Sequence, residues 1–285
     1  MSGLRRYFEF VRFSHTVFAL PFALASMVVA ADGWPGLRTF LLIVAAMVGA
    51  RTAAMGFNRI VDRRFDALNP RTADRHLPTG KISLGAAWVL TLLSAVGFII
   101  IAGFINWICF VLSPLALAIV FFYSVTKRFT DFTHFFLGLS LAVAPVGGWL
   151  AVRSGFDWSP LVLALAVIFW LTGFDIIYAT QDYQFDKSVG LHSLPVRWGI
   201  VRSLRFARWM HVCMWLALNG FGWVAGLGWP YYGGLAVIAV CLVYEHWLAM
   251  RGDPVSVNVA SLRVNGVVSV VFLVAVVTAV AMNGH

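Results

Sequence analysis

Charged residues are scarce in this 285-residue chain: they make up 12% of it, whereas hydrophobic residues make up 61%. Soluble domains contain about 45–50% apolar residues. The composition therefore excludes a soluble globular protein and indicates a polytopic membrane protein. Its size is then not bounded by what a single globular core can hold.

Cysteine is also rare, with only Cys109, Cys213 and Cys241 in the chain. Each lies in a separate apolar segment and none has the spacing of a metal site, so we interpret all three as small hydrophobic residues. The alternating pattern of barrel strands is absent. No small-residue cleavage site follows the first apolar stretch, so we expect no cleavable signal peptide.

Long apolar segments are abundant, and nine of them approach the roughly 20 residues that a membrane-spanning helix needs. They cover residues 13–31, 38–57, 84–105, 107–124, 133–152, 160–181, 204–225, 231–249 and 263–282. The sequence predicts an all-α membrane protein with nine transmembrane helices in one bundle.

The basic residues are distributed unevenly about these segments. With the N-terminus in the cytoplasm, all of the 21 lysines and arginines except Arg38 and Arg153 fall on the cytoplasmic side. This is the positive-inside pattern. The net charge of +9 therefore indicates anionic lipid head groups or an anionic substrate rather than a nucleic acid. The long connections after the second and sixth segments are predicted to be cytoplasmic as well.

Two acidic motifs lie in those long connections. Asn58, Asp62 and Asp66 are spaced i, i+4, i+8 and form one stripe if the second segment continues as a helix. Asp182 and Asp186 repeat the i, i+4 spacing at the end of the sixth segment. Because four segments separate the motifs, both are expected at the cytoplasmic mouth of the bundle.

The two motifs also resemble each other. The first contains DRRFD and the second DYQFD, and a Leu-Pro pair follows each. We interpret this as a weak internal repeat of the first four and the next four segments, with the ninth appended to a single domain of residues 1–285.

The ligand types favour a hard cation. Five oxygen-bearing side chains without thiols or a spaced histidine pair favour Mg²⁺ over Ca²⁺ or Zn²⁺. Arg63, Arg71 and Arg75 beside the first motif suit a diphosphate that completes the shell of the metal. The alternative is that these charges form solvated loop faces and pair with one another.

Further polar residues lie near or within the segments. Arg51 and Asp175 are intramembrane, where ionisable groups are costly and usually functional. A structural Arg51–Asp175 ion pair is the alternative. Tyr123, Lys127 and Arg128 end the fourth segment in YSVTKR. Lys127 and Arg128 either hold phosphate oxygens or extend to lipid head groups.

These motifs together resemble the UbiA superfamily of intramembrane aromatic prenyltransferases. The resemblance spans nearly the whole chain and is carried by NRIVDRRFDALNPRTADRHLP, YSVTKR and DYQFDKSVGLHSLPVRWG. The segments RFSHTVFALPFAL and GFDIIYATQDYQFD are similar to bacterial members that prenylate 4-hydroxybenzoate and to relatives in menaquinone synthesis. The resemblance implies a bundle around a central cavity, cytoplasmic cap segments, Mg²⁺, a polyprenyl diphosphate donor and the bacterial inner membrane.

The resemblance also implies roles for individual residues. Asn58, Asp62, its extension Asp66, Asp182 and Asp186 match the metal motifs, and Lys127 and Arg128 match the basic pair for the diphosphate. Arg59 stands where some branches have aspartate, which leaves the number of metal ions open.

The predicted reaction is transfer of a polyprenyl group to a ring carbon of an aromatic acid, 4-hydroxybenzoate or a dihydroxynaphthoate. As a hypothesis, Arg51 binds the carboxylate of the acceptor or the diphosphate. Asp175 orients the acceptor or takes its proton, and Tyr123 stabilises the cation or binds phosphate. A lipid or ion transporter is the alternative from a different class.

Overall fold

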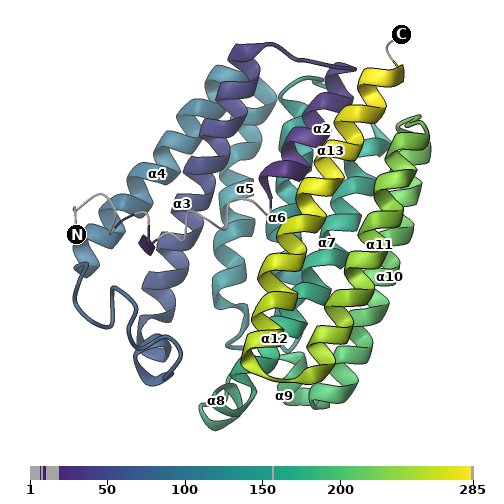
Figure 1. Cartoon of the computed structure of the whole chain (residues 1–285). Coiled ribbons are helices and arrows are strands. Elements are labelled where there is room, and N and C mark those ends of the chain that lie inside the picture. The colour runs from purple at the N-terminus through teal and green to yellow at the C-terminus, as the bar shows by residue number, and fades with distance from the viewer. Residues whose placement is uncertain (1–6, 8, 11–18, 156, 284–285) are drawn as a thin grey trace. The chain divides into compact units, whose positions relative to one another are not determined.

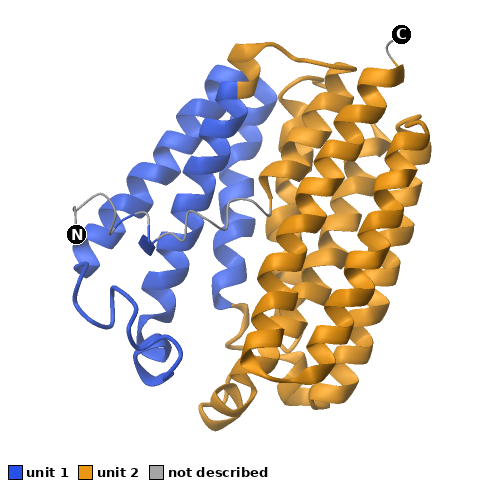
Figure 2. Cartoon of the chain, viewed as in Figure 1, with its two compact units in different colours: residues 1–16, 41–125 blue, residues 17–40, 126–285 orange. Residues whose placement is uncertain are grey.

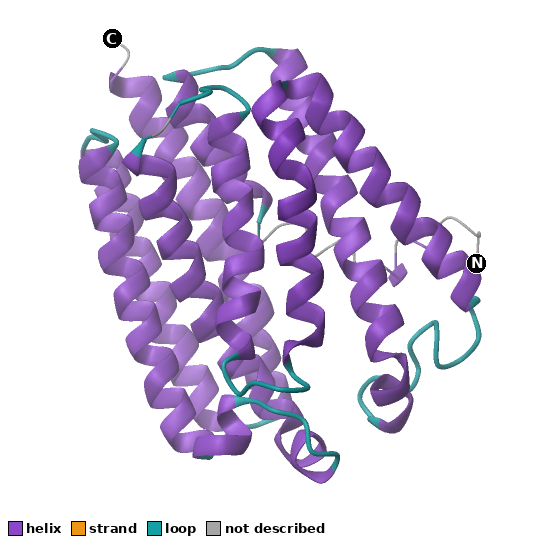
Figure 3. Cartoon of the chain, turned by 180° about the vertical axis from the view of Figure 1, so that it is seen from behind, coloured by secondary structure: helices purple, strands orange, loops and turns teal. Residues whose placement is uncertain are grey.

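Helices account for all regular secondary structure in the part of the chain that the structure describes, a computed structural model of residues 7, 9, 10, 19–155 and 157–283 (Figure 3). Among the described residues, seven helical stretches are long and apolar enough to cross a membrane. The predicted all-α class is therefore confirmed, and seven of the nine predicted spans have a counterpart among these stretches.

The helix bounds follow the apolar segments closely, and most helices are labelled in Figure 1. The elements are α2 (Leu20–Ala31), α3 (Leu37–Leu68), α4 (Leu84–Ile105), α5 (Trp107–Thr126), α6 (Thr133–Leu150), α7 (Trp158–Ala179), the 3₁₀ turn η2 (Thr180–Asp182), α8 (Tyr183–Ser188), α9 (Leu194–Trp198), α10 (Ile200–Val224), α11 (Trp229–Arg251), α12 (Pro254–Asn258), the π-helical turn η3 (Val259–Val264) and α13 (Asn265–Asn283).

Three predicted segments differ informatively from the helices found. Segment 38–57 continues as α3 to Leu68, because neither glycine nor proline follows until Pro70. Segment 204–225 forms α10, whose hydropathy is reduced by polar residues, so it is not among the seven apolar stretches. Segment 13–31 corresponds to α2 from Leu20 onward, and residues 13–18 lie outside the described residues.

The chain divides into two compact units, coloured separately in Figure 2. Unit 1 comprises residues 1–16 and 41–125 and holds most of α3 with α4 and α5. Within it, α3 and α4 approach closely at Gly56, where an added Cβ would collide with Oγ1 of Thr91. Small residues at a helix crossing allow such an approach in membranes. The crossing fixes the part of α3 that carries the first acidic motif.

Unit 2 comprises residues 17–40 and 126–285, which include α2 and α6 to α13. Its core is aromatic: the ring of Phe22 on α2 lies 4.8 Å from Trp170 on α7 and 4.6 Å from Phe272 on α13. Gly138 on α6 lies directly against the backbone of Ile168 on α7. This close contact sets the register of α6 against α7.

The basic residues of unit 2 are distributed unevenly between its two ends. The α7–α10 and α11–α12 connections lie at one end of the unit, and the C-terminal end of α13 lies at the other (Figure 1). The first end contains Lys187, Arg197 and Arg251, whereas the α6–α7 connection contains only Arg153. Within unit 2 the basic residues therefore gather at the end that carries the second acidic motif.

Candidate active site

The second acidic motif begins where α7 leaves its α-helical geometry. The helix tightens into η2, which ends at Asp182, and Asp186 lies one turn later in the short helix α8. A 3₁₀ turn advances by about 120° per residue instead of 100°. The continuous α-helical face predicted for Asp175 and Asp182 is therefore interrupted. Both residues still belong to one unbroken helical stretch, in which η2 follows α7 directly.

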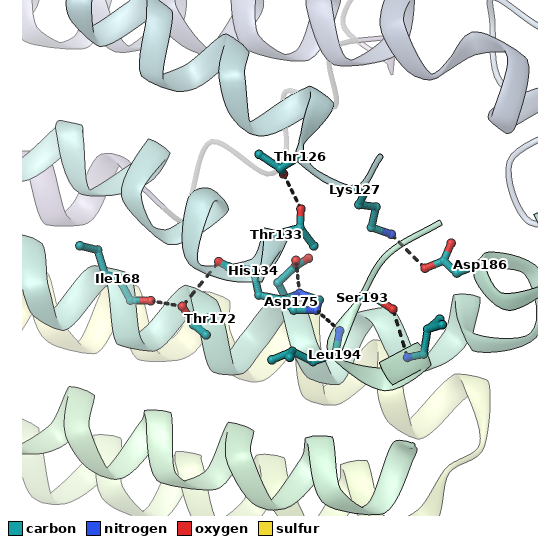
Figure 4. Close-up of polar contacts among 11 residues, drawn as sticks. Thr126, Lys127, Thr133, His134, Ile168, Thr172, Asp175, Asp186, Ser193 and Leu194 are labelled. Carbon is teal, nitrogen blue, oxygen red and sulfur yellow. Dashed lines mark hydrogen bonds and ion pairs between the residues drawn. The ribbon is translucent and has the colours of Figure 1, made fainter. Parts of the chain in front are cut away.

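Lys127 lies close to this motif and pairs with one of its carboxylates. Its Nζ lies 3.2 Å from Oδ2 of Asp186 (Figure 4). Burial lowers the pKa of Lys127, but the charges of Asp186, Asp175 and Asp182 together raise it above its ordinary value. Lys127 is therefore held as a cation, and three carboxylates lie within its electrostatic reach.

Asp175 contacts a histidine that the sequence prediction missed. Nδ1 of His134, in the first turn of α6, lies 2.7 Å from Oδ2 of Asp175 (Figure 4). The backbone N–H of Leu194 donates to Nε2 of His134 over 3.3 Å. One histidine in an apolar segment has no periodic pattern, so only the packing of α6 on α7 reveals it.

A second group fastens the loop of the second motif beside Lys127. The backbone N–H of His192 donates to the carbonyl of Lys127 at 2.8 Å. Asp131 lies 2.9 Å from Nδ1 of His192 and 2.7 Å from Nη1 of Arg197. We call Asp131, His192 and Arg197 the loop latch. It joins the α5–α6 connection to the second motif and was not predicted from the sequence.

The first motif lies in unit 1 on the extension of α3. The side-chain amide of Asn58 donates to Oδ2 of Asp62 at 3.0 Å, as an i, i+4 pair on one helical face should. Asp66 accepts from Nη1 of Arg75 at 2.5 Å, and Nη1 of Arg59 lies 4.0 Å from its other oxygen. Metal ligation by Asp66 would therefore compete with an ion pair already formed.

Known proteins match this chain over most of its length. The model of the UbiA prenyltransferase family matches residues 19–267. The chain belongs to this family. A 4-hydroxybenzoate octaprenyltransferase from Pseudomonas aeruginosa is 33% identical over 235 residues, which cover 80% of this chain and 77% of that relative.

Solved structures of UbiA homologues have the same fold. An apo structure from Aeropyrum pernix K1 has a TM-score of 0.84 at 31% identity and covers 93% of this chain and 98% of its own. A homologue from Archaeoglobus fulgidus bound to DMAPP and Mg²⁺ has a TM-score of 0.69 at 20% identity and covers 97% and 99%. At that lower identity the likeness supports the fold alone.

The remaining residues predicted for a UbiA site lie on α3, on α5 and in the connections that follow these two helices. Arg51 and Arg63 are partly buried on α3, and Tyr123 is partly buried on α5. Arg71 and Arg128 are exposed. The N–H of Arg71 is held by the side chain of Asn69 at 3.0 Å. Within unit 2, Asp175 pairs with His134.

The donor set is compatible with the Mg²⁺ that the UbiA family implies. Among the described residues, no group of three or more His, Cys, Asp or Glu is arranged to hold a metal ion. Magnesium, however, needs only one or two protein carboxylates, because waters and substrate phosphates complete its shell. Asp175, Asp182 and Asp186 all lie within the electrostatic reach of Lys127. The second motif therefore has the oxygen ligands that Mg²⁺ favours.

Proposed function

We propose that this protein transfers a polyprenyl group from a polyprenyl diphosphate to a ring carbon of an aromatic acid, with Mg²⁺ and with 4-hydroxybenzoate as the acceptor. The observation that carries the proposal is the group of Asp175, Asp182 and Asp186 around Lys127 at the end of a membrane helix. Such a group can bind both a divalent cation and a diphosphate. The 4-hydroxybenzoate relative and the Archaeoglobus homologue with DMAPP and Mg²⁺ support the substrate class.

The metal-binding role goes to the two acidic motifs. Asn58 and Asp62 of the first motif and Asp182 and Asp186 of the second are the proposed Mg²⁺ ligands. Bound there, Mg²⁺ would neutralise negative charge on the diphosphate. Asp66 and Arg75 pair with each other, so their first role in the proposal is to shape the loop after α3.

The basic residues bind and orient the donor. Lys127, Arg128, Arg63 and Arg71 offer charge-assisted hydrogen bonds to phosphate oxygens. The prenyl chain extends among apolar helices, which keep water from the allylic carbon. The C1–O bond of the donor breaks, the diphosphate leaves with the bonding electrons, and the allylic carbon becomes cationic.

The acceptor residues complete the reaction. A ring carbon of the acceptor forms the new C–C bond, and the proton on that carbon goes to a base. Arg51 is proposed to bind the acceptor's carboxylate, and Tyr123 to stabilise the cation through its ring. Asp175 orients the acceptor hydroxyl or takes the proton, because its side chain is 13% exposed and so remains reachable.

The membrane topology follows the charge distribution. We propose nine spans, in which α2 and α10 join the seven apolar stretches, with the N-terminus and both acidic motifs in the cytoplasm of a bacterium. Connections 69–83 and 183–199 then act as cap segments. The gathering of basic residues at one end of unit 2 supports this orientation.

Product analysis with purified protein in detergent tests the function. The protein is incubated with geranyl diphosphate, MgCl₂ and either 4-hydroxybenzoate or 1,4-dihydroxy-2-naphthoate, and products are identified by mass. We expect prenylated 4-hydroxybenzoate, release of diphosphate, and loss of both with EDTA. If product forms only with the naphthoate, the acceptor is a dihydroxynaphthoate rather than 4-hydroxybenzoate. Absence of product from either acceptor, with detergent-stable protein, would contradict the proposal.

A further inference from the structure

His134 lies between two functional parts of unit 2 and is completely buried, with a side-chain exposure of 0%. On one side its Nδ1 lies 2.7 Å from Oδ2 of Asp175 on α7. On the other side the N–H of Leu194, the first residue of α9, lies 3.3 Å from its Nε2. Figure 4 shows the imidazole between these two partners. His134 thus links a membrane helix to the loop of the second motif.

These partners determine the tautomer of His134. A backbone N–H can only donate, so Nε2 of His134 must be the acceptor for Leu194. The imidazole then carries its proton on Nδ1 and donates it to Asp175. The same arrangement makes Oδ2 of Asp175 an acceptor that is fixed in direction. One neutral histidine therefore satisfies an orphan amide of α9 and orients a carboxylate.

The packing around His134 leaves it little freedom. It lies one helical turn before Gly138, where α6 meets the backbone of α7. On α7, Oγ1 of Thr172 donates to the carbonyl of Ile168 at 2.7 Å and lies 3.5 Å from the carbonyl of His134. These contacts hold the backbone of α6 at His134 close to α7, the helix that carries Asp175.

The loop reaches His134 and Lys127 through neighbouring amides. The N–H of His192 donates to the carbonyl of Lys127 at 2.8 Å, and the N–H of Leu194 donates to His134. Ser193 between them is extended, with φ −160° and ψ 159°. In extended backbone the amides of residues i and i+2 point to the same side. A single extended segment therefore contacts both the Lys127–Asp186 pair and the His134–Asp175 pair.

We propose that His134 is a positioning residue for the acceptor: it fixes the direction of the Asp175 carboxylate and ties it to the loop that also contacts Lys127. This rests on the proposed function, in which Asp175 orients the acceptor. The two pairs then have separate tasks. Lys127–Asp186 serves the diphosphate, whereas His134–Asp175 serves the aromatic acid.

Substitutions at His134 should change acceptor kinetics selectively. In His134→Leu both hydrogen bonds are lost, and we expect kcat/KM for the acceptor to fall about 10- to 100-fold, as for a misplaced catalytic group. The KM for geranyl diphosphate should change less than about twofold, because Lys127–Asp186 is intact. His134→Gln should restore most of the activity, because its amide can donate to Asp175 and accept from Leu194.

A double-mutant cycle separates positioning from a general structural role. If His134 acts through Asp175, His134→Leu should have almost no further effect in an Asp175→Ala background. Asn219→Leu is the matched control, since it removes one side-chain hydrogen bond within α10 and should leave both KM values within about twofold. Additive effects of His134→Leu and Asp175→Ala would overturn the inference, and so would equal losses for donor and acceptor.

The outcomes remain distinguishable from failure of the proposed function. Wild-type protein that makes no prenylated product contradicts the function, whereas active wild-type protein with additive mutants contradicts only the role of His134. If the His134→Leu variant cannot be purified in a folded state, the His134→Gln and His134→Asn variants are compared instead. The shorter Asn cannot span both partners, so Gln should exceed it in acceptor kcat/KM, and equal values would overturn the inference.

Discussion

Unit 2 contains two groups of polar side chains within mainly apolar surroundings, and they are built differently. The first, which we call the site cluster, consists of Lys127, His134, Asp175, Asp182 and Asp186. The second, which we call the bundle cluster, consists of Trp170, His211, Glu245, His246 and Asn265. Both contain acidic groups and histidine, so residue type alone does not tell them apart.

The bundle cluster is sealed and largely satisfied by its own members. Nδ1 of His211 lies 3.0 Å from Nε2 of His246, and Asn265 donates to Glu245 at 2.7 Å and accepts from the indole of Trp170. The amide of Asn265 also contacts carbonyls of η3, where the π-helical turn leaves them available. All of these residues come from helices, and each side chain is completely or nearly completely buried.

The site cluster differs in its loops and in its charge. Lys127 follows α5 in a connection and its side chain is 34% exposed, while the loop amides of His192 and Leu194 contact the cluster. Three aspartates lie within the electrostatic reach of Lys127 there. Burial of polar groups is thus common to both clusters. Contact with loops and a partly exposed lysine distinguish the site cluster from the bundle cluster.

Removal of Asp182 should have the largest effect on activity. Asp182→Ala takes away a proposed metal ligand, and kcat/KM should fall by at least about 10²–10³-fold, the range for loss of one strong electrostatic contact. The unfolding midpoint in detergent should stay close to that of wild type. Asp157→Asn is the matched control, because asparagine also caps the N-terminus of α7. Near-normal turnover of Asp182→Ala with Mg²⁺ would contradict the site assignment.

Part of the fold and of the site cluster can be predicted from the sequence, whereas the bundle cluster cannot. The spacing of Asn58 and Asp62 predicted a shared face on condition that the second segment continues as a helix, and α3 does continue to Leu68. The echo at Asp182 and Asp186 singled out the second motif. His134 and the bundle cluster were missed, because their partners lie between 20 and 95 positions apart, as for Glu245–Asn265 and Trp170–Asn265. Such pairs arise from helix packing, which no local pattern encodes.

Lys127 should give the next largest effect, directed at the donor. Lys127→Met removes a charge-assisted contact, and the KM for geranyl diphosphate should rise about 10- to 100-fold, with the acceptor KM little changed. Lys127→Arg should recover part of the loss, since it keeps the charge. Steady-state kinetics with each substrate varied in turn measure both values. An equal rise in the acceptor KM would contradict the proposal that Lys127–Asp186 serves the diphosphate and His134–Asp175 serves the aromatic acid.

The bundle cluster should respond in stability rather than in activity. Asn265→Leu removes the partners of Glu245 and of the Trp170 indole, and we expect a loss of about 2 kcal/mol from several modest intramembrane hydrogen bonds. Thermal unfolding in detergent measures the change, and turnover per folded molecule should remain within about twofold. Val267→Leu, at an exposed position on α13, is the control. A selective loss of turnover without destabilisation would break the contrast between the clusters.

The loop latch should give the smallest effect, although it lies beside the site cluster. Burial raises the pKa of Asp131, but hydrogen bonds from Arg197 and His192 lower it more, so the pKa falls below its ordinary value of 3.8. The stabilisation is therefore complete above that value and is lost as the pH falls through the lower pKa of the folded protein.

Because both partners are partly exposed, Asp131→Asn should cost only about 0.2–1 kcal/mol near neutral pH. The difference in unfolding midpoint from wild type should narrow once the pH falls below 3.8. Ser154→Ala, in the exposed α6–α7 connection, is the control for pH effects unrelated to the latch. A difference that is as large at about pH 3 as at about pH 7 would mean that Asp131 acts through its shape rather than its charge.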